Sequence, residues 1–229
     1  MGDVKWLVRY LDEKQENDTV MAYYLFPQYD NIERNAIRVN KSSIDDSITL
    51  FITLAHEGLP GHLYQDAYDF KNNKYKPFRG TLYYMAYTEG WTVHIEKLAY
   101  EWCLDNADVA TLRNDEGRLN YLVVSLCDIL VNYYGYDQAQ LKTWLSDYGF
   151  EQSAKGIYEF VTVNPTSYLY YGFGFLLMED TLDALQAKGM TEAEAYKAIL
   201  DMGAVPMSYI WETYGIENPV KAVAKASAA

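Results

Sequence analysis

The segment at residues 54–65 constrains the backbone more than any other part of the chain, because two histidines flank a proline and a glycine. Six residues of a regular α-helix turn a side chain by about 240°, so His56 and His62 would point apart on an unbroken helix. Pro60 lacks a backbone N–H and clashes with the preceding turn, while Gly61 relaxes the backbone. The sequence therefore predicts that the helix is distorted or ends at Pro60-Gly61, which can swing His62 back toward His56.

This segment has two interpretations. His56-Glu57 begins like the zinc-peptidase motif His-Glu-x-x-His, in which two histidines share one helical face and the glutamate activates a zinc-bound water. Here the second histidine comes two residues later than in that motif. The residues alone therefore indicate either a metal site across a broken helix or a helix end with incidental histidines.

A second group of polar residues lies on the helix predicted at about 80–104. Glu89 and Glu96 are seven residues apart and share one helical face. An acid among tyrosines and a tryptophan is costly to bury unpaired, and either a metal ion or an ion pair with Arg79 would relieve that cost. A carboxylate from a following helix is the usual third ligand in His/His/Glu zinc sites, so Glu89 is the candidate. The third histidine, His94, lies in the same segment.

Caps and hydrophobic periodicity predict a mainly α-helical fold with at most a small two-strand element near the N-terminus. Asp3 would cap the first helix, Ser42 or Ser43 the second, Asp137 with Gln140 a later one, and Thr191 with Glu194 another. We expect strands at 21–26 and 35–40, joined by a polar turn at Asp30-Asn31. The expected helices cover about 3–16, 43–59, 80–104, 115–134, 137–149, 150–160, 167–187, 191–201 and 206–215. No linker divides the chain, so we expect one domain over 1–229 with a frayed tail at 220–229.

Composition excludes several classes of protein. Half of the residues are hydrophobic and the formal net charge is −13, which argues against disorder, nucleic-acid binding and docking on anionic lipid. The uncharged stretch 160–178 contains a proline and polar residues, so we expect a loop and a buried helix there, without membrane insertion. Cys103 and Cys127 are too few for a disulfide scaffold and can pair or remain thiols. The 23 tyrosines either fill the core and surface or line a polar-aromatic cavity.

Taken together, the two segments resemble the bacterial DUF885 family, whose members look like zincin-type metallopeptidases. The family pattern His-Glu-x-x-Pro-Gly-His matches residues 56–62, its Glu-Gly-Trp matches residues 89–91, and its later glutamate matches Glu96. The segment 22–27 and the region of Asn40 also resemble the family, and the likeness extends over about 20–215. Three positions depart from the pattern: Leu63 replaces a second histidine, Ser167 replaces a glutamine, and Asn132 replaces a histidine after the retained Asp128.

The resemblance implies a zinc-dependent hydrolase that acts on a peptide substrate. Zn²⁺ would be bound by His56, His62 and Glu89, and Glu57 would be the general base. Tyr171 would donate a hydrogen bond to the developing oxyanion. The alternatives for this role are four tyrosines nearby in the sequence, Tyr148, Tyr158, Tyr168 and Tyr170. Glu96 and Asp128 would each orient a ligand imidazole by accepting its other N–H.

An alternative is a non-catalytic domain with the family fold, which would bind a peptide or a partner through a tyrosine-rich surface. Family members are longer, so the resemblance also implies that this chain is a C-terminal portion of such an architecture. The N-terminal region of the parent chain would then supply a wall of the cleft. We expect the 229 residues alone either to self-associate or to leave the metal ligands open to solvent and poorly occupied, and to have weak or no activity. Localisation in the bacterial cytoplasm or outside it is left open.

Overall fold

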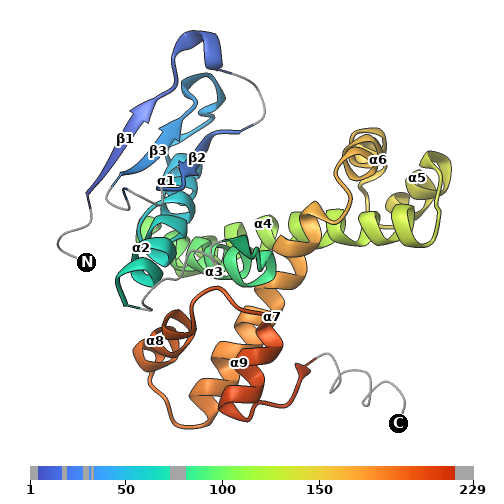
Figure 1. The fold of residues 1–229 in the computed structure, drawn as a ribbon. Coiled ribbons are helices and arrows are strands. Elements are labelled where there is room, and N and C mark those ends of the chain that lie inside the picture. The colour runs from blue at the N-terminus through green and yellow to red at the C-terminus, as the bar shows by residue number, and fades with distance from the viewer. Residues whose placement is uncertain (1–4, 17–19, 28–30, 32–33, 73–80, 220–229) are drawn as a thin grey trace.

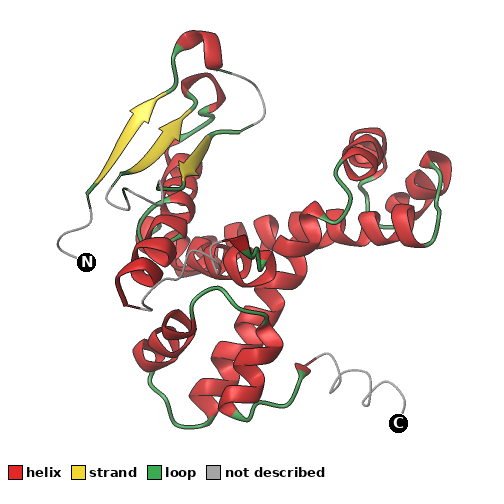
Figure 2. Ribbon diagram, in the orientation of Figure 1, coloured by secondary structure: helices red, strands yellow, loops and turns green. Residues whose placement is uncertain are grey.

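The computed structural model describes residues 5–16, 20–27, 31, 34–72 and 81–219, and it is mainly α-helical, as predicted (Figures 1 and 2). The three strands are β1 (Trp6–Tyr10), β2 (Ala22–Leu25) and β3 (Asn35–Val39). The α-helices are α1 (Ser47–Glu57), α2 (His62–Asn72), α3 (Met85–Cys103), α4 (Ala107–Asp128), α5 (Gln138–Ser146), α6 (Ala154–Val163), α7 (Ser167–Ala187), α8 (Glu192–Met202) and α9 (Met207–Tyr214). Short turns of helix are η1 (Glu13–Gln15), η2 (Lys41–Ser43) and η5 (Glu151–Ser153), and the π-helix η4 (Ile129–Tyr133) extends α4.

The sheet has the order β1-β3-β2, so it contains one strand more than the sequence predicted. Strands β2 and β3 confirm the strand pair expected at 20–40, and they run antiparallel. The helix expected at 3–16 is wrong, because Trp6–Tyr10 pairs in parallel with β3 instead. A short apolar run fits the periodicity of a helix and that of a strand, so the sequence does not distinguish them. Pairing with the backbone of β3 makes this run a strand. The proposed cap Asp3 and the turn residue Asp30 lie outside the described residues.

Most predicted helix ends are confirmed. Capping boxes form at Asp137 with Gln140 and at Thr191 with Glu194. Helix α1 begins later than predicted, because the side chain of Asp46 accepts hydrogen bonds from the N–H groups of Ile48 and Thr49. The serines that were expected to cap it lie in η2.

The uncharged stretch 160–178 is divided between α6 and α7 by a short loop, as predicted. Among the residues that the structure describes, no helix is both long enough and apolar enough to span a bilayer. Both cysteines are free thiols.

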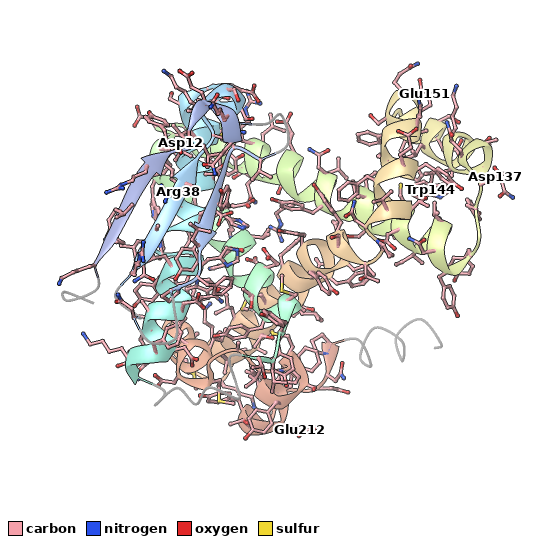
Figure 3. All side chains as sticks on the ribbon, turned by 45° about the horizontal axis from the view of Figure 1, so that its top comes forward. Asp12, Arg38, Asp137, Trp144, Glu151 and Glu212 are labelled. Atoms are coloured by element: carbon pink, nitrogen blue, oxygen red, sulfur yellow. The ribbon has the colours of Figure 1, made fainter. Side chains whose placement is uncertain are left out.

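Helices α3 and α7 cross at the centre of the molecule, and the main hydrophobic core forms around them. The sheet packs over α1, with Ile37 and Val39 buried against a cluster that includes Leu63 of α2. Helices α5 and α6 form a lobe with its own small core at the end of α4. Figure 3 shows Asp137, Trp144 and Glu151 on this lobe, well away from Asp12 and Arg38 of the sheet region.

Candidate metal centre

The helix that carries His56 ends before Pro60, as predicted from the 240° offset. Helix α1 stops at Glu57 and α2 begins at His62, so the two histidines belong to different helices. The turn between them is closed by a hydrogen bond from the N–H of Gly61 to the carbonyl of Ala55, 3.0 Å long. The imidazole rings lie edge to face with their centroids 4.8 Å apart.

The glycine and the tryptophan of the two motifs hold this turn in place. A Cβ atom on Gly61 would lie 1.8 Å from the carbonyl oxygen of His56, so only glycine allows the chain to fold back here. The indole Nε1–H of Trp91 donates a 2.9 Å hydrogen bond to the carbonyl oxygen of Pro60. Helix α3 therefore anchors the turn that brings the two histidines together.

Glu89 of α3 faces both imidazoles. Its Oε2 atom lies 3.6 Å from Nε2 of His56 and 3.5 Å from Nε2 of His62. One ligand atom from each of the three residues can be chosen so that all lie within 4.8 Å of one another. Tetrahedral zinc with ligand bonds of about 2.0–2.1 Å separates its ligand atoms by about 3.3 Å, so the two nitrogen–oxygen distances fit such an ion.

His56 and Glu89 each alter the pKa of the other. Burial alone would lower the pKa of His56, but the carboxylates of Glu89 and Glu96 raise it to about 10. Burial alone would raise the pKa of Glu89, but the two imidazoles lower it to about 2. The site is therefore arranged around a buried carboxylate, only 4% exposed, that is stabilised by positive charge.

Glu96 occupies the position predicted for it. The Nδ1–H of His56 donates a 2.7 Å hydrogen bond to Oε1 of Glu96, which leaves Nε2 directed at Glu89. The hydroxyl of Tyr121 on α4 donates a 3.0 Å hydrogen bond to the same oxygen. This arrangement fixes the tautomer of His56, as carboxylates commonly do for metal-ligating histidines.

Asp128 does not orient a ligand imidazole, and that prediction is wrong. Its Oδ2 accepts a 2.6 Å hydrogen bond from the N–H of Thr166, which precedes α7, and its Oδ1 accepts one from Asn132. Asp128 therefore secures the start of α7. Asn132 is part of that support, because its amide donates to Asp128 and to the carbonyl oxygen of Val161.

Glu57 lines the same cavity as two of the three ligand candidates. Its Oε2 accepts a 2.8 Å hydrogen bond from the N–H of Tyr24, so strand β2 holds the carboxylate in place. The cavity measures about 530 Å³ and is also lined by His62, Glu89 and Tyr171. The base candidate Glu57 and the ligand candidates His62 and Glu89 thus line one cavity.

Tyr171 belongs to α7 and lies beside His56. Its ring stacks against His56 with centroids 6.3 Å apart and against Tyr121 at 5.2 Å. Burial, with the nearby charges of Glu89 and Glu57, raises the pKa of Tyr171 far above its usual value. The hydroxyl therefore keeps its proton and can act as a hydrogen-bond donor.

The remaining motif positions lie elsewhere. Nδ1 of His94 pairs with Glu179 at 2.5 Å and its Nε2 lies 2.9 Å from the hydroxyl of Tyr196, so His94 belongs to a separate, partly buried network. Leu63 is fully buried against the sheet, and Ser167 is the first residue of α7. Arg79, the alternative partner of Glu89, lies outside the described residues.

Sequence reasoning missed two contributors to the site. Tyr121 is one of 23 tyrosines and no local pattern distinguishes it. Tyr24 acts through its backbone N–H, which carries no residue-type signal at all.

The fold and the site define a mainly helical protein with a candidate His–His–Glu metal centre built where α1, α2 and α3 meet. The chain belongs to the DUF885 family, described as bacterial protein of unknown function, whose profile matches residues 1–213. No curated protein matches the chain. A similar solved structure is that of a protein described as "the putative lipoprotein from Colwellia psychrerythraea", with a TM-score of 0.69 and 23% sequence identity. The match covers 90% of this chain and only 37% of that one, and at this identity it shows a common fold.

Proposed function

We propose that this chain carries the centre of a zinc-dependent hydrolase that cleaves peptide bonds. The observation that supports the proposal best is the convergence of ligand atoms from His56, His62 and Glu89 within 4.8 Å, with Glu57 lining the cavity that His62 and Glu89 also line. Two imidazoles and one carboxylate are a donor set typical of catalytic zinc. When bound, zinc polarises a carbonyl group and lowers the pKa of water.

The chain's own residues account for the proton transfers. Glu57 is positioned by the N–H of Tyr24, so it can accept a proton from the attacking water and pass it to the leaving amine. Tyr171 stays protonated and can donate a hydrogen bond to the oxygen on which negative charge develops. Glu96 keeps His56 in the tautomer that directs Nε2 at the centre. A cavity of about 530 Å³ with an aromatic wall suits a few residues of a peptide.

Metal content and turnover test the proposal separately. The purified chain should hold about one zinc ion, and a chelator should lower its melting temperature. Glu57→Gln should retain zinc and lose peptide hydrolysis, because it removes the base and leaves the ligands. His56→Ala, His62→Ala and Glu89→Ala should each lose zinc as well.

Two results would contradict the proposal. Zinc content that falls in Glu57→Gln and survives in Glu89→Ala would reverse the roles of the two carboxylates. A chain that binds no zinc and shows no change on chelation would instead behave as the non-catalytic binding domain that the sequence leaves open.

We also propose that the longer family architecture covers part of this chain. Strand β1 exposes all five of its side chains, among them Trp6, Leu7, Val8 and Tyr10, and large exposed apolar patches usually mark contacts. Light scattering should detect self-association of the 229 residues, and addition of the upstream region of a parent protein should suppress it and raise turnover. A monodisperse monomer whose turnover rate does not change on that addition would contradict this proposal.

A further inference from the structure

Tyr121 of α4 meets the metal centre through both its hydroxyl and its ring, and the proposed mechanism gives it no role. The hydroxyl donates a 3.0 Å hydrogen bond to Oε1 of Glu96. The same oxygen accepts the Nδ1–H of His56 at 2.7 Å. A carboxylate has no proton to give, so both partners donate to it. The position of Tyr121 therefore limits where the oxygen that orients His56 can lie.

The ring of Tyr121 stacks on that of Tyr171, with centroids 5.2 Å apart and an angle of 17° between the planes. Tyr171 stacks in turn on His56, with centroids 6.3 Å apart and an angle of 23° between the planes. The three rings form one column that runs from α4 through α7 to α1. The hydrogen bonds to Glu96 connect the two ends of this column, so the four side chains form a closed cycle.

The close approach of α4 and α7 supports this cycle. The hydroxyl of Ser125 on α4 lies 2.7 Å from the carbonyl oxygen of Tyr121 and 2.7 Å from that of Tyr168 on α7. Gly172 directly follows Tyr171, and a Cβ atom there would lie 2.3 Å from the same hydroxyl oxygen. The backbones of the two helices therefore fix the distance between the stacked rings.

The two kinds of contact restrain His56 in different ways. The hydrogen bond from Nδ1 to Glu96 directs the opposite nitrogen toward Glu89, and stacking on Tyr171 limits the tilt of the imidazole out of its plane. Both restraints lead back to Tyr121. Packing and hydrogen bonds outside the ligand shell commonly hold a metal ligand in the orientation that it needs.

We propose that Tyr121 is a positioning residue, whose hydroxyl holds Glu96 against His56 and whose ring holds Tyr171 beside the metal centre. This inference rests on the proposed function, because it concerns the same site. If Tyr121 only filled space between helices, phenylalanine would serve equally well at this position.

The first test follows the Nδ1 proton of His56 in the metal-free chain. The chain has three histidines, so labelling them with ¹⁵N gives few imidazole signals in an NMR spectrum. Tyr121→Phe keeps the ring and removes the hydroxyl, and it should speed exchange of this proton with water about tenfold, the value of one hydrogen bond to a charged group. The matched control is Tyr68→Phe, which removes a hydroxyl that donates to Asp201 outside the cavity lining and should leave the exchange rate unchanged.

The second test asks whether Tyr121 acts through Glu96. Tyr121→Phe should weaken zinc binding about tenfold in a competition titration, at the lower end of the range for partners outside the ligand shell. In the Glu96→Gln background the same substitution should change zinc affinity by less than about twofold, because the carboxylate through which it acts is gone. Independent packing effects would instead add in the double variant.

The third test concerns the ring and uses calorimetry with a phosphinic tripeptide, whose tetrahedral anion resembles the transition state of peptide hydrolysis. At saturating zinc, Tyr121→Leu should bind this probe about threefold to tenfold more weakly than Tyr121→Phe, since one aromatic pair contributes about this factor. Tyr121→Met replaces the leucine variant if circular dichroism shows that leucine impairs folding.

An unchanged exchange rate in Tyr121→Phe, additive effects on zinc affinity, or equal binding of the probe by the two variants would each overturn the proposal. A chain that holds no zinc would refute the proposed hydrolase, whereas exchange of the His56 proton would still decide whether Tyr121 positions that residue.

Discussion

Substitution of Gly90 by alanine tests whether α3 and α7 approach as closely as described. A Cβ atom on Gly90 would lie 2.4 Å from the carbonyl oxygen of Gly174 and 2.7 Å from its carbonyl carbon. Both atoms are backbone, so one helix must move as a unit, and overpacking of this kind costs about 3 kcal/mol. Alanine recovers about 1 kcal/mol through its higher helix propensity, so Gly90→Ala should lower the free energy of unfolding by about 2 kcal/mol.

Gly117 provides the matched control, because it lies within α4 and a Cβ atom there would meet nothing within 4 Å. Gly117→Ala should raise the free energy of unfolding by about 1 kcal/mol. For a chain of this size, 1 kcal/mol corresponds to about 2–4 °C in melting temperature. Thermal melting followed by circular dichroism should therefore show a decrease of about 4–8 °C for Gly90→Ala and an increase of about 2–4 °C for Gly117→Ala. If both variants were stabilised alike, the close helix crossing that places Glu89 and Tyr171 together would be refuted.

Three further predictions concern the metal centre. Glu96→Gln should weaken zinc binding by about 10- to 100-fold in a competition titration, because the imidazole of His56 loses its carboxylate partner; an unchanged affinity would show that this contact does not matter to the metal. Gly61→Ala should abolish zinc binding while far-UV circular dichroism stays helical, because the new Cβ atom would clash with backbone carbonyl groups and force the turn open. Wild-type zinc content in this variant would contradict the described turn. The pKa of His56 is raised from 6.5 to about 10, so its contribution to metal-free stability is complete below about pH 6.5 and is lost as the pH rises toward 10. Zinc must displace that proton, so the apparent zinc affinity should rise about tenfold per pH unit between pH 7 and 8.5, and a flat profile there would show that His56 is already neutral.

Features encoded by neighbouring residues were predictable from the sequence. The capping boxes at Thr191 and Asp137 need only a side chain and the third residue after it, and both form as predicted. The break at Pro60-Gly61 was predictable for the same reason, because it follows from the geometry of two adjacent residues. The spacing of seven between Glu89 and Glu96 likewise put the two acids on one face.

Features that depend on distant partners were not predictable. Trp6–Tyr10 becomes a strand because β3 offers backbone hydrogen bonds, and nothing within the five residues distinguishes strand from helix. Asp128 has the residue type of an imidazole partner, yet the N–H of Thr166 takes that position through the approach of α7. The sequence could propose a role for this carboxyl group, and only the packing of helices could assign it.

The spacing of residues on helix α3 restricts where homologues can gain or lose residues. Within eight residues it carries the ligand candidate Glu89, the glycine of the helix crossing, the anchor Trp91 and the orienting Glu96. One inserted or deleted residue between Glu89 and Glu96 would rotate the second carboxylate by about 100° and shift it by about 1.5 Å, away from His56. Insertions and deletions should therefore be absent from this stretch in any homologue that keeps the centre, whereas the connections between helices are free to change length.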